Sequence, residues 1–526
     1  MSQGLYTVSL YETLGPQTTQ FIMQHAELTS VACSLPHVPT LLSLAPRLPL
    51  LKLIIVLDSL DNGEQEGSSK GSILNGLAAQ RGITIWSLDQ VEKLGADLGH
   101  PMRPVQPSDL YTINYTSGTT GDPKGVLLTH ASALASNCTT LITNPPAKED
   151  VGLSYLPLAH LLQRLVEHAG FAGGASFGYF QGDLTLLAED IKLLQPTTFA
   201  SVPRLFNRFA SAIRASTVEA DGIKGMLSRS AMDAKIASLQ LPIGQATCNH
   251  WLYDRIWTPK IRAALGFGRL RVLASGSAPL DPQAQHTLAA AFGVPCFQAY
   301  GMTETSGVVT AQLKGDFSTG NVGPPMPCAE MCLESIPELE YYVTDKPFPR
   351  GELLVRGPAT FAGYLKNDEE NKKALGADGW LHTGDVATID ELGRISIIDR
   401  KKNIVKLSQG EYVAPEQIEN IYATNTTLIA MTFVHGDSTK SSLVGIFDVN
   451  PETFAPFASG ILKKQIDAAD LEAIRQAAAD PRVKKEFQKI LDKIGRDNKF
   501  AGFQRVKNVL LRVAPFSVEN GLLTPT

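Results

Sequence analysis

The chain has 526 residues, which is too long for one ordinary hydrophobic core and predicts two or three domains. Apolar residues make up 44% and charged residues 19%, as in globular enzymes and unlike disordered proteins. The net charge of −5 provides no basic field for nucleic acid, so we expect no such partner. Six scattered cysteines favour reduced thiols in an intracellular setting.

The two ends of the sequence carry no recognisable targeting signal. The first residues lack the basic and apolar regions of a secretory signal, and the final Thr524-Pro525-Thr526 is not a peroxisomal tripeptide. No run approaches the ~18 apolar residues of a membrane-spanning helix. We therefore expect an intracellular protein, either cytoplasmic or peripheral to an organelle membrane.

Short apolar runs alternate with segments of helical length through the first three quarters of the chain. Buried strands are predicted at 51–58, 111–116, 152–156, 197–202, 270–275 and 294–300, and helices at 18–28, 158–170 and 282–292. Near-continuous apolar runs are typical of strands that are covered on both faces. The alternation predicts an α/β fold of layered sheets and helices with largely parallel strands.

The remaining segments predict loops, an insertion and a second domain. Composition favours surface loops at 59–72 and 315–327, and an insertion with its own helices at 214–249. After Arg400 a helix is expected to begin near Ala414. It is followed by strands at 428–435 and 443–449, helices around 466–496 and a last strand at 508–515. We therefore predict a large domain at 1–399 and a small α+β domain at 400–526.

A loop rich in glycine and hydroxyl groups follows the strand at 111–116. It carries the candidate phosphate-binding residues Thr116, Ser117, Gly118, Thr119, Thr120, Gly121 and Lys124. Glycine lets backbone N–H groups converge on an anion, and lysine adds a mobile positive charge. The Walker pattern is excluded because Lys124 is followed by glycine. An ordinary surface turn is the alternative, since such residues also dominate turns.

This string resembles the phosphate loop of adenylate-forming enzymes, which include acyl-CoA synthetases, luciferases and adenylation domains of peptide synthetases. Later segments continue the resemblance in the same order. They contain Gly276, Ser277 and Ala278, and then Tyr300, Gly301, Thr303 and Glu304. The resemblance implies that these two segments enclose the adenine and the α-phosphate of ATP.

The residue types suit these implied roles. Tyr300 offers an aromatic face to a purine, and Thr303 offers a hydroxyl donor. Glu304 supplies hard carboxylate oxygens for Mg²⁺, and the resemblance assigns Thr116 to the same ion. It also implies that Asp385 accepts both ribose hydroxyls, because a carboxylate can form two charge-assisted bonds. Arg400 is expected to contact the same sugar.

The stretch at 378–419 resembles the signature of long-chain fatty acyl-CoA synthetases. By this resemblance Lys402 is the interdomain hinge, Lys406 serves the thioester step, and Gly410 belongs to a loop that lines the coenzyme A tunnel. Ile389 stands where this branch usually has tryptophan. The departure leaves the length of the acyl chain open.

The resemblance implies an acid–thiol ligase that uses ATP, Mg²⁺ and coenzyme A. A carboxylate attacks the α-phosphate to give acyl-AMP and pyrophosphate, and the thiolate of coenzyme A then displaces AMP. Alternatives are a ligase that loads a carrier-protein thiol in polyketide or lipopeptide biosynthesis, and an impaired nucleotide- or acyl-binding remnant. Peripheral contact with a membrane or lipid surface also stays open.

Both ends of the sequence depart from the family pattern. The YETLG segment at 11–15 usually follows a longer stretch that includes the first strands, and 519–526 resembles the approach to a motif with a catalytic lysine. We therefore expect this chain to lack that lysine. It should then convert supplied acyl-AMP and coenzyme A better than it uses fatty acid and ATP.

Overall fold

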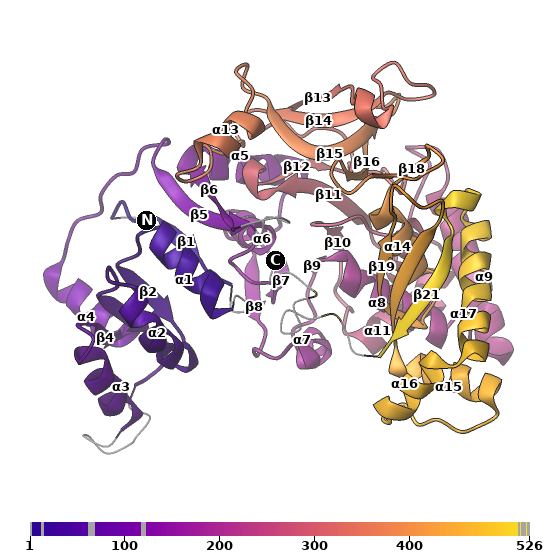
Figure 1. Cartoon of the computed structure of the whole chain (residues 1–526), viewed down its shortest axis with the longest axis horizontal. Coiled ribbons are helices and arrows are strands. Elements are labelled where there is room, and N and C mark those ends of the chain that lie inside the picture. Colours follow the sequence, from indigo (N-terminus) through magenta and orange to yellow (C-terminus); the bar gives the residue numbers. More distant parts are fainter. Residues whose placement is uncertain are drawn as a thin grey trace. The chain divides into compact units, whose positions relative to one another are not determined.

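The computed structural model describes residues 3–11, 15–60, 69–116, 122–513, 516 and 522. The chain divides into two compact units (Figure 1). The first comprises Met1–Ala131, Phe361–Asp368 and Thr524–Thr526, and the second comprises Ser132–Thr360 and Glu369–Leu523. The domain boundary predicted at residue 400 falls inside the second unit and stays a prediction.

The first unit contains a parallel three-stranded sheet with helices packed on it. Its strands are β2 (Ser30–Cys33), β3 (Leu53–Val56) and β4 (Thr84–Ser87), and its helices are α1 (Pro16–His25), α2 (Val38–Leu44), α3 (Lys70–Ala79) and α4 (Leu88–Leu98). Leu41, Ile54 and Ile85 are buried in its core. The loop predicted at 59–72 extends too far along the chain. Ser69 accepts a hydrogen bond from the Ser72 amide and caps the start of α3.

A second small sheet in this unit carries the start of the candidate phosphate loop. Its strands are β1 (Thr7–Ser9), β5 (Leu110–Thr116) and β6 (Lys124–Thr129). The core residues Ile113 and Tyr115 lie on β5. Antiparallel pairing of β5 with β6 sets Thr116 opposite Lys124. The five candidates at 117–121 between these strands lie outside the described residues.

A six-stranded sheet dominates the second unit and is parallel except for one edge. Its order is β12-β11-β10-β9-β7-β8, and only β12 runs antiparallel to its neighbour. The strands are β7 (Val151–Ser154), β8 (Ser176–Tyr179), β9 (Thr198–Ser201), β10 (Val272–Ser275), β11 (Cys296–Met302) and β12 (Gly307–Ala311). This sheet matches the largely parallel arrangement that the sequence predicts.

The helices of this part follow the predicted alternation and include the expected insertion. They are α5 (His130–Thr143), α6 (Leu161–Ala172), α7 (Leu187–Leu194), α8 (Pro203–Ser216), α9 (Gly222–Leu239), α10 (Tyr253–Ile256), α11 (Thr258–Leu265) and α12 (Pro282–Phe292). Aromatic rings join the sheet to the helices: Phe267 lies 5.3 Å from Phe199 and 5.2 Å from Phe292, centroid to centroid. Such edge-on packing is favourable for buried rings.

An antiparallel four-stranded sheet follows, which the sequence analysis did not anticipate. Its strands are β13 (Glu330–Glu334), β14 (Arg350–Arg356), β15 (Leu381–Ile389) and β16 (Ile395–Arg400), and α13 (Asp368–Ala374) precedes β15. Leu353, Val355 and Ala387 form the buried face of this sheet. The segment predicted as a loop at 315–327 contains no helix or strand.

The chain after Arg400 has the α+β character that the sequence predicts. A short hairpin, β17 (Val405–Lys406) and β18 (Tyr412–Val413), leads to α14 (Pro415–Thr424). The sheet β19 (Ile429–His435), β20 (Leu443–Val449) and β21 (Val506–Arg512) packs with α15 (Pro451–Leu462), α16 (Leu471–Ala479) and α17 (Pro481–Asp497) (Figure 1). Tyr422, Phe447, Phe454 and Phe487 are fully buried and form a core of this region's own.

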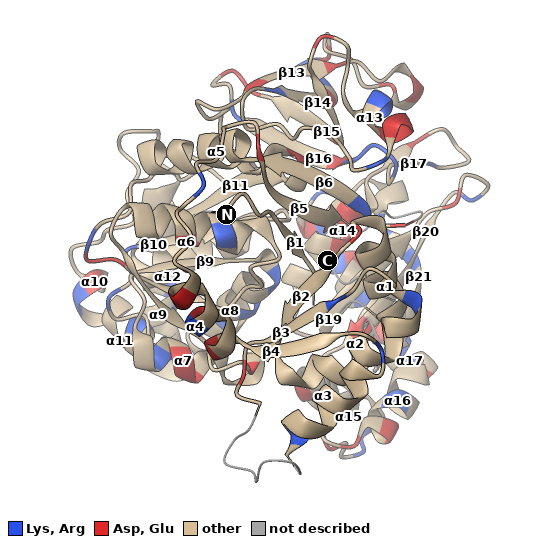
Figure 2. Cartoon of the chain, turned by 90° about the vertical axis from the view of Figure 1, so that its left-hand side faces the viewer, with Lys and Arg blue, Asp and Glu red and all other residues tan. Residues whose placement is uncertain are grey.

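The surface carries both signs of charge. Figure 2 shows lysine and arginine interspersed with aspartate and glutamate, for example along α13. The expectation that no nucleic acid binds stays a prediction. Among the described residues, no helix combines the length and apolar character needed to cross a membrane.

Candidate active site

A tyrosine and a carboxylate that are 85 residues apart in sequence meet in the second unit. The Tyr300 hydroxyl on β11 donates a 2.6 Å hydrogen bond to Asp385 Oδ2 on β15. The Asp385 amide donates to Thr383 Oγ1, which in turn donates to the Leu353 carbonyl, so local bonds fix the position of the carboxylate. The structure therefore brings together the residues predicted for adenine and ribose.

Burial controls the charge of this pair. Asp385 is only 8% exposed, and this burial raises the pKa of its carboxyl, while the Tyr300 hydrogen bond and the Arg400 charge oppose the shift. Burial also raises the pKa of Tyr300 well above its usual value, and the negative charge of Asp385 adds to the rise. The tyrosine is therefore a neutral donor.

Arg400 lies directly opposite Asp385 in the pairing of β15 with β16. Its Nε atom is 3.6 Å from Asp385 Oδ1, and its side chain is half exposed. An exposed ion pair of this length stabilises the fold little by itself. The arginine therefore keeps donors available for a ligand beside the carboxylate.

The two segments predicted to enclose the nucleotide follow neighbouring parallel strands. Gly276, Ser277 and Ala278 lie in the loop after β10, and Ser277 has a left-handed backbone with φ of 74°. β11 pairs beside β10 and carries Tyr300 and Gly301. A Cβ atom at Gly301 would lie 1.8 Å from the Gly307 carbonyl oxygen, so only glycine fits there. The carboxyl ends of parallel strands commonly form ligand sites.

The predicted metal ligands lie in different units. Thr303 and the buried Glu304 belong to a short 3₁₀ turn (Thr303–Thr305) immediately after β11. Thr116 ends β5, and Lys124 begins β6 with its Nζ atom 5.2 Å from the centre of the Tyr364 ring. A hydroxyl and a carboxylate are hard oxygen donors, so their chemistry fits Mg²⁺. Their pairing as ligands stays a prediction.

The segment around the predicted hinge is held by a small polar cluster. Asp399 accepts hydrogen bonds from the Arg400 and Glu416 amides, and the Asn403 amide nitrogen donates to Glu416 Oε1 at 2.6 Å. Burial and the neighbouring Glu416 charge raise the pKa of Asp399 to about 6. Lys402 lies in the turn between β16 and β17. The chain on either side of Lys402 is thus joined through Asp399 and α14.

The two predicted residues beyond the hinge lie on the β17–β18 hairpin. Lys406 Nζ donates to the Tyr412 hydroxyl at 2.8 Å and lies 3.3 Å from Glu340 Oε1. Gly410 occupies the connecting turn with φ of 91°, where glycine is favoured. No hydrogen bond or ion pair between described residues joins Lys406 or Gly410 to Tyr300, Asp385 or Arg400. Their part in the thioester step stays a prediction.

The comparisons with known proteins agree with this arrangement. The family model described as "AMP-binding enzyme" matches residues 1–365. The chain belongs to this AMP-binding enzyme family. It is 51% identical to the peroxisomal Acyl-CoA ligase 891 of Penicillium roqueforti, over 100% of this chain and 74% of that relative. It is 40% identical to the peroxisomal Long chain acyl-CoA synthetase 7 of Arabidopsis thaliana, over 99% of this chain and 71% of that relative.

A solved structure supports the fold of this family member. The adenylation domain of a carboxylate reductase from Mycobacterium chelonae matches with a TM-score of 0.78 and 27% sequence identity. The match covers 98% of this chain and 73% of that chain. The α/β adenylation fold predicted from the sequence is thereby confirmed.

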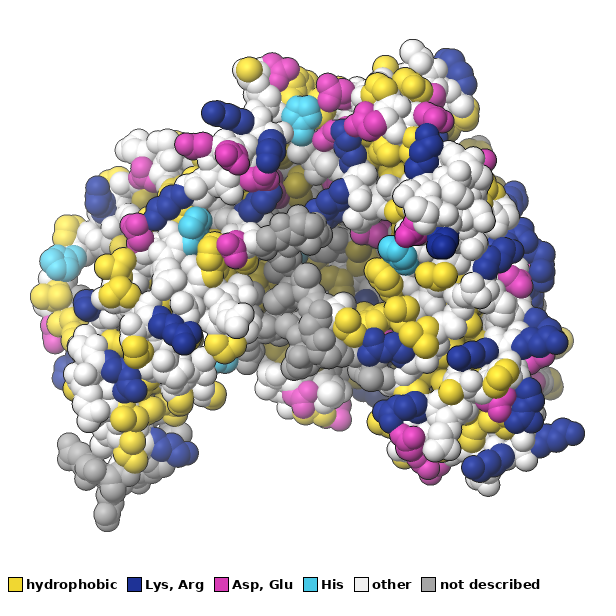
Figure 3. All heavy atoms as spheres, in the orientation of Figure 1, with side chains coloured by type: hydrophobic (Ala, Val, Ile, Leu, Met, Phe, Trp, Pro, Cys, Tyr) yellow, Lys and Arg dark blue, Asp and Glu magenta, His cyan; other side chains and the backbone are white. Residues whose placement is uncertain are grey.

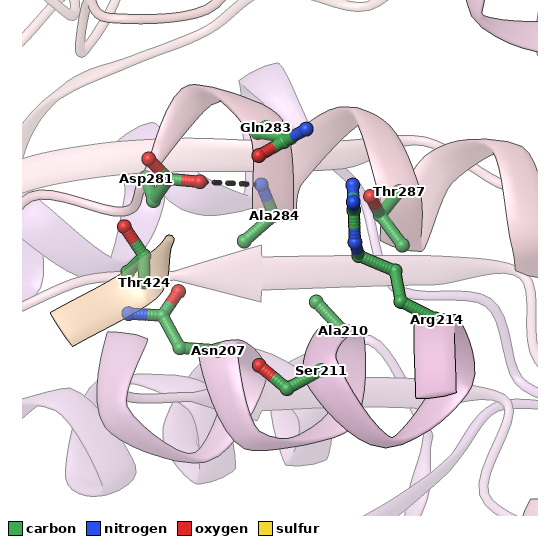
Figure 4. A pocket seen from close by; sticks show the side chains of 9 residues that line it. All are labelled: Asn207, Ala210, Ser211, Arg214, Asp281, Gln283, Ala284, Thr287 and Thr424. Carbon is green, nitrogen blue, oxygen red and sulfur yellow. Dashed lines mark hydrogen bonds between the residues drawn. The ribbon is translucent and has the colours of Figure 1, made fainter. Parts of the chain in front are cut away.

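A pocket elsewhere in this AMP-binding protein contains none of the predicted site residues. It is a small, partly open pocket between α8, α12 and the end of α14. Figure 4 shows the Asp281 carboxylate directed at the Ala284 amide, a 2.7 Å bond that caps α12. The interior of the pocket has room for little more than a water molecule, whereas ligand pockets usually begin at roughly 300 Å³. The pocket is therefore not assigned to the nucleotide or the acyl chain.

The sequence analysis missed two groups near the predicted residues. It did not foresee the hydrogen bond between Tyr300 and Asp385, because no pattern pairs residues so far apart. It also passed over Asp399 and, on α14, Glu419. Burial raises the pKa of Glu419 to about 7. Its position on a helix close to the apolar Ile418 and Tyr422 was the sequence signal that could have indicated this burial.

Proposed function

We propose that this protein activates a long-chain fatty acid with ATP and transfers the acyl group to coenzyme A. A carboxylate oxygen bonds to the α-phosphorus while the bond to the β-phosphate bridging oxygen breaks, which releases pyrophosphate. The thiolate of coenzyme A then attacks the acyl carbonyl, and AMP leaves. The observation that best supports this function is the arrangement of Tyr300, Asp385 and Arg400 in a chain whose relatives are named acyl-CoA ligase and acyl-CoA synthetase.

The nucleoside is bound by three side chains in this proposal. Tyr300 presents its ring to the adenine while its hydroxyl is held by Asp385. The Asp385 carboxylate accepts the ribose hydroxyls, and Arg400 donates to the same sugar. Such preorganised groups need no reorientation when the nucleotide arrives.

Phosphate and metal binding depend on the loop at 116–124 and on Glu304. Lys124 is proposed to contact the phosphates, as are Ser117, Gly118, Thr119, Thr120 and Gly121, with Gly276, Ser277, Ala278, Gly301 and Thr303 around the α-phosphate. Thr116 and Glu304 are proposed to hold Mg²⁺, which neutralises phosphate charge when bound. This chemistry needs position and charge, without a nucleophilic side chain.

The second half-reaction is proposed to use the chain after residue 400 as a mobile domain. This region has its own core around Phe447 and Phe487, which supports a boundary near 400. Rotation about Lys402 would present Lys406 and the Gly410 turn to the acyl-AMP. Glycine at 410 suits a turn that must fit closely against a ligand.

Coenzyme A is the proposed acceptor, since the two relatives described above are named acyl-CoA ligase and acyl-CoA synthetase. Six free cysteines support an intracellular location, and the names of both relatives suggest the peroxisome. A peripheral lipid contact is proposed for the exposed apolar residues of α9, such as Ile223 and Met226. Flotation with liposomes tests that contact.

The experiment is a pair of assays on the purified chain with saturated fatty acids of increasing length. We expect pyrophosphate release and acyl-CoA formation with ATP, and highest kcat/KM for long chains. A parallel reaction offers a carrier-protein thiol in place of coenzyme A. Transfer only to the carrier thiol would contradict the proposed acceptor. Absence of both adenylation and thioester formation from supplied acyl-AMP would contradict the ligase itself.

A further inference from the structure

Three metal-ligating side chains that are not among the residues assigned to ATP converge on the antiparallel sheet. They are Glu334 on β13, Glu352 on β14 and His382 on β15, and their ligand atoms all lie within 4.8 Å of one another. Figure 3 shows acidic side chains and a histidine gathered at the top of the molecule, where Figure 1 places these strands. We propose that Glu334, Glu352 and His382 bind a divalent transition-metal ion of the Zn²⁺ class.

The backbone pairing puts two negative charges opposite each other. Glu334 and Glu352 are direct cross-strand partners, a placement that is unfavourable for like charges. Among the described residues, no lysine or arginine lies within ion-pair distance of Glu334. In this part of the structure, Glu334 pairs with His382, whose Nδ1 atom is 3.7 Å from its Oε2 atom. A cation between the carboxylates would remove the repulsion.

The imidazole lies between the two carboxylates without bonding to either. His382 Nδ1 is 3.7 Å from Glu334 Oε2 and 3.7 Å from Glu352 Oε1. These distances exceed those of hydrogen bonds, about 2.7–3.2 Å. Ligands of a tetrahedral zinc ion lie about 3.3 Å from one another, given bonds of about 2.0–2.1 Å. Each histidine–carboxylate distance therefore needs to shorten by only a few tenths of an ångström around such an ion, and the two carboxylates, within 4.8 Å of each other, would have to close as well.

Glu352 keeps a free coordination position for this ion. Its Oε1 atom accepts the Gly384 amide at 3.2 Å, and its Oε2 atom lies 3.3 Å from Lys401 Nζ. A carboxylate oxygen has two lone pairs, so Oε1 can hold the amide and ligate a metal. Lys401 can stay on Oε2, where it also pairs with Glu338 at 3.1 Å. No existing contact of Glu352 has to break.

The donor set selects the kind of ion. An imidazole with two carboxylates suits Zn²⁺ and related transition ions, whereas Mg²⁺ and Ca²⁺ prefer oxygen-only ligands. Glu352 is 8% exposed and fixed by its neighbours, while Glu334 is 57% exposed and free to adjust. The ion would hold together three adjacent strands. A fourth position would face water.

The test measures metal binding directly and needs no enzyme activity. The purified full chain is stripped with a chelator and titrated with Co²⁺ without ATP, followed by visible absorption. We expect one equivalent to bind with d–d bands, to be displaced by Zn²⁺ and to resist millimolar Mg²⁺. Glu334→Gln and His382→Gln should each weaken binding at least about tenfold.

Cys332→Ser is the matched control, because Cys332 lies two residues before Glu334 on the same strand but outside the triad. It should bind Co²⁺ like the unchanged chain. Thermal unfolding without metal establishes that each variant is folded. Glu334→Gln is the variant least able to disturb the fold, because the Glu334 side chain is exposed. The proposal is overturned if no equivalent binds, if His382→Gln binds normally, or if only Cys332→Ser loses the metal.

Discussion

A buried carboxylate is sensitive to the proton as well as to its ligand, and Asp385 is such a group. Its carboxylate form is needed to accept two ribose hydroxyls. Since burial raises the pKa of Asp385, protonation begins at a higher pH than for an ordinary aspartate. Acidification should therefore weaken ATP binding before it unfolds the protein.

Asp385→Asn tests this role and should raise the KM for ATP by about 10- to 100-fold, from the loss of charge-assisted hydrogen bonds. Tyr300→Phe is the companion variant, because it keeps the ring and removes only the donor to Asp385. Without that donor the pKa of Asp385 rises further, so the increase in KM on acidification should start at a higher pH. KM–pH profiles check both variants. Identical profiles for Tyr300→Phe and the unchanged chain would contradict the coupling.

Glu304→Gln removes one negative ligand from the proposed Mg²⁺ site and keeps the shape of the side chain. We expect adenylate formation to fall about 10²-fold or more, and more Mg²⁺ to be needed for half-maximal rate. Pyrophosphate release at varied Mg²⁺ measures both effects. Exposed Glu189→Gln on α7 is the control and should match the unchanged chain. A normal Mg²⁺ requirement in Glu304→Gln would remove this residue from the metal site.

Helix α14 contains a glutamate whose burial makes the fold pH-dependent. Glu419 accepts the Val434 amide of β19 at 2.7 Å, and burial raises the pKa of its carboxyl to about 7. A raised carboxyl pKa means that the folded state holds the proton more tightly. This contribution to stability is full below the ordinary pKa of about 4.5 and is lost as the pH rises through 7.

Glu419→Gln cannot ionise but can still accept the Val434 amide through its side-chain oxygen. At pH 8 we expect the variant to unfold with a free energy about 2 kcal/mol higher than the unchanged chain, and at pH 5 the difference should largely vanish. Urea unfolding at the two pH values measures this. Exposed Glu472→Gln on α16 serves as the control. At each pH the free energy of unfolding of the unchanged chain is subtracted from that of the variant. A difference that is smaller at pH 8 than at pH 5 would contradict the assignment.

At the scale of helices and strands, the sequence predicts some elements well and others not at all. β9, β10 and β11 were found because strands covered on both faces are continuously apolar. The antiparallel β13–β16 sheet escaped because charged positions and the glycines inside its strands, Gly351 and Gly384, interrupt the alternation. α15 was missed since Pro456 inside it is read as a helix breaker. The approach of Tyr300 to Asp385 depends on tertiary structure, so the sequence reached those residues only through resemblance.

At the scale of the whole molecule, the proposed hinge separates two half-reactions. Lys402→Pro fixes φ and removes a backbone donor, which should slow conversion of acyl-AMP to acyl-CoA while adenylation continues. Lys402→Ala keeps the backbone free and is the matched control. Single-turnover assays with fatty acid and ATP, and with supplied acyl-AMP and coenzyme A, measure the two steps. Equal loss in both steps, or equal effects of the two variants, would contradict rotation about Lys402.

The hydrogen bond between Tyr300 and Asp385 also bears on which sugar the protein accepts. A carboxylate offers about four lone-pair positions, and the tyrosine takes one of them. A 2′-deoxyribose would leave a further buried position without a donor, which a site built around hydroxyl groups penalises heavily. The enzyme should therefore discriminate ATP from 2′-deoxy-ATP through a single carboxylate, and Asp385→Asn should lose most of that preference.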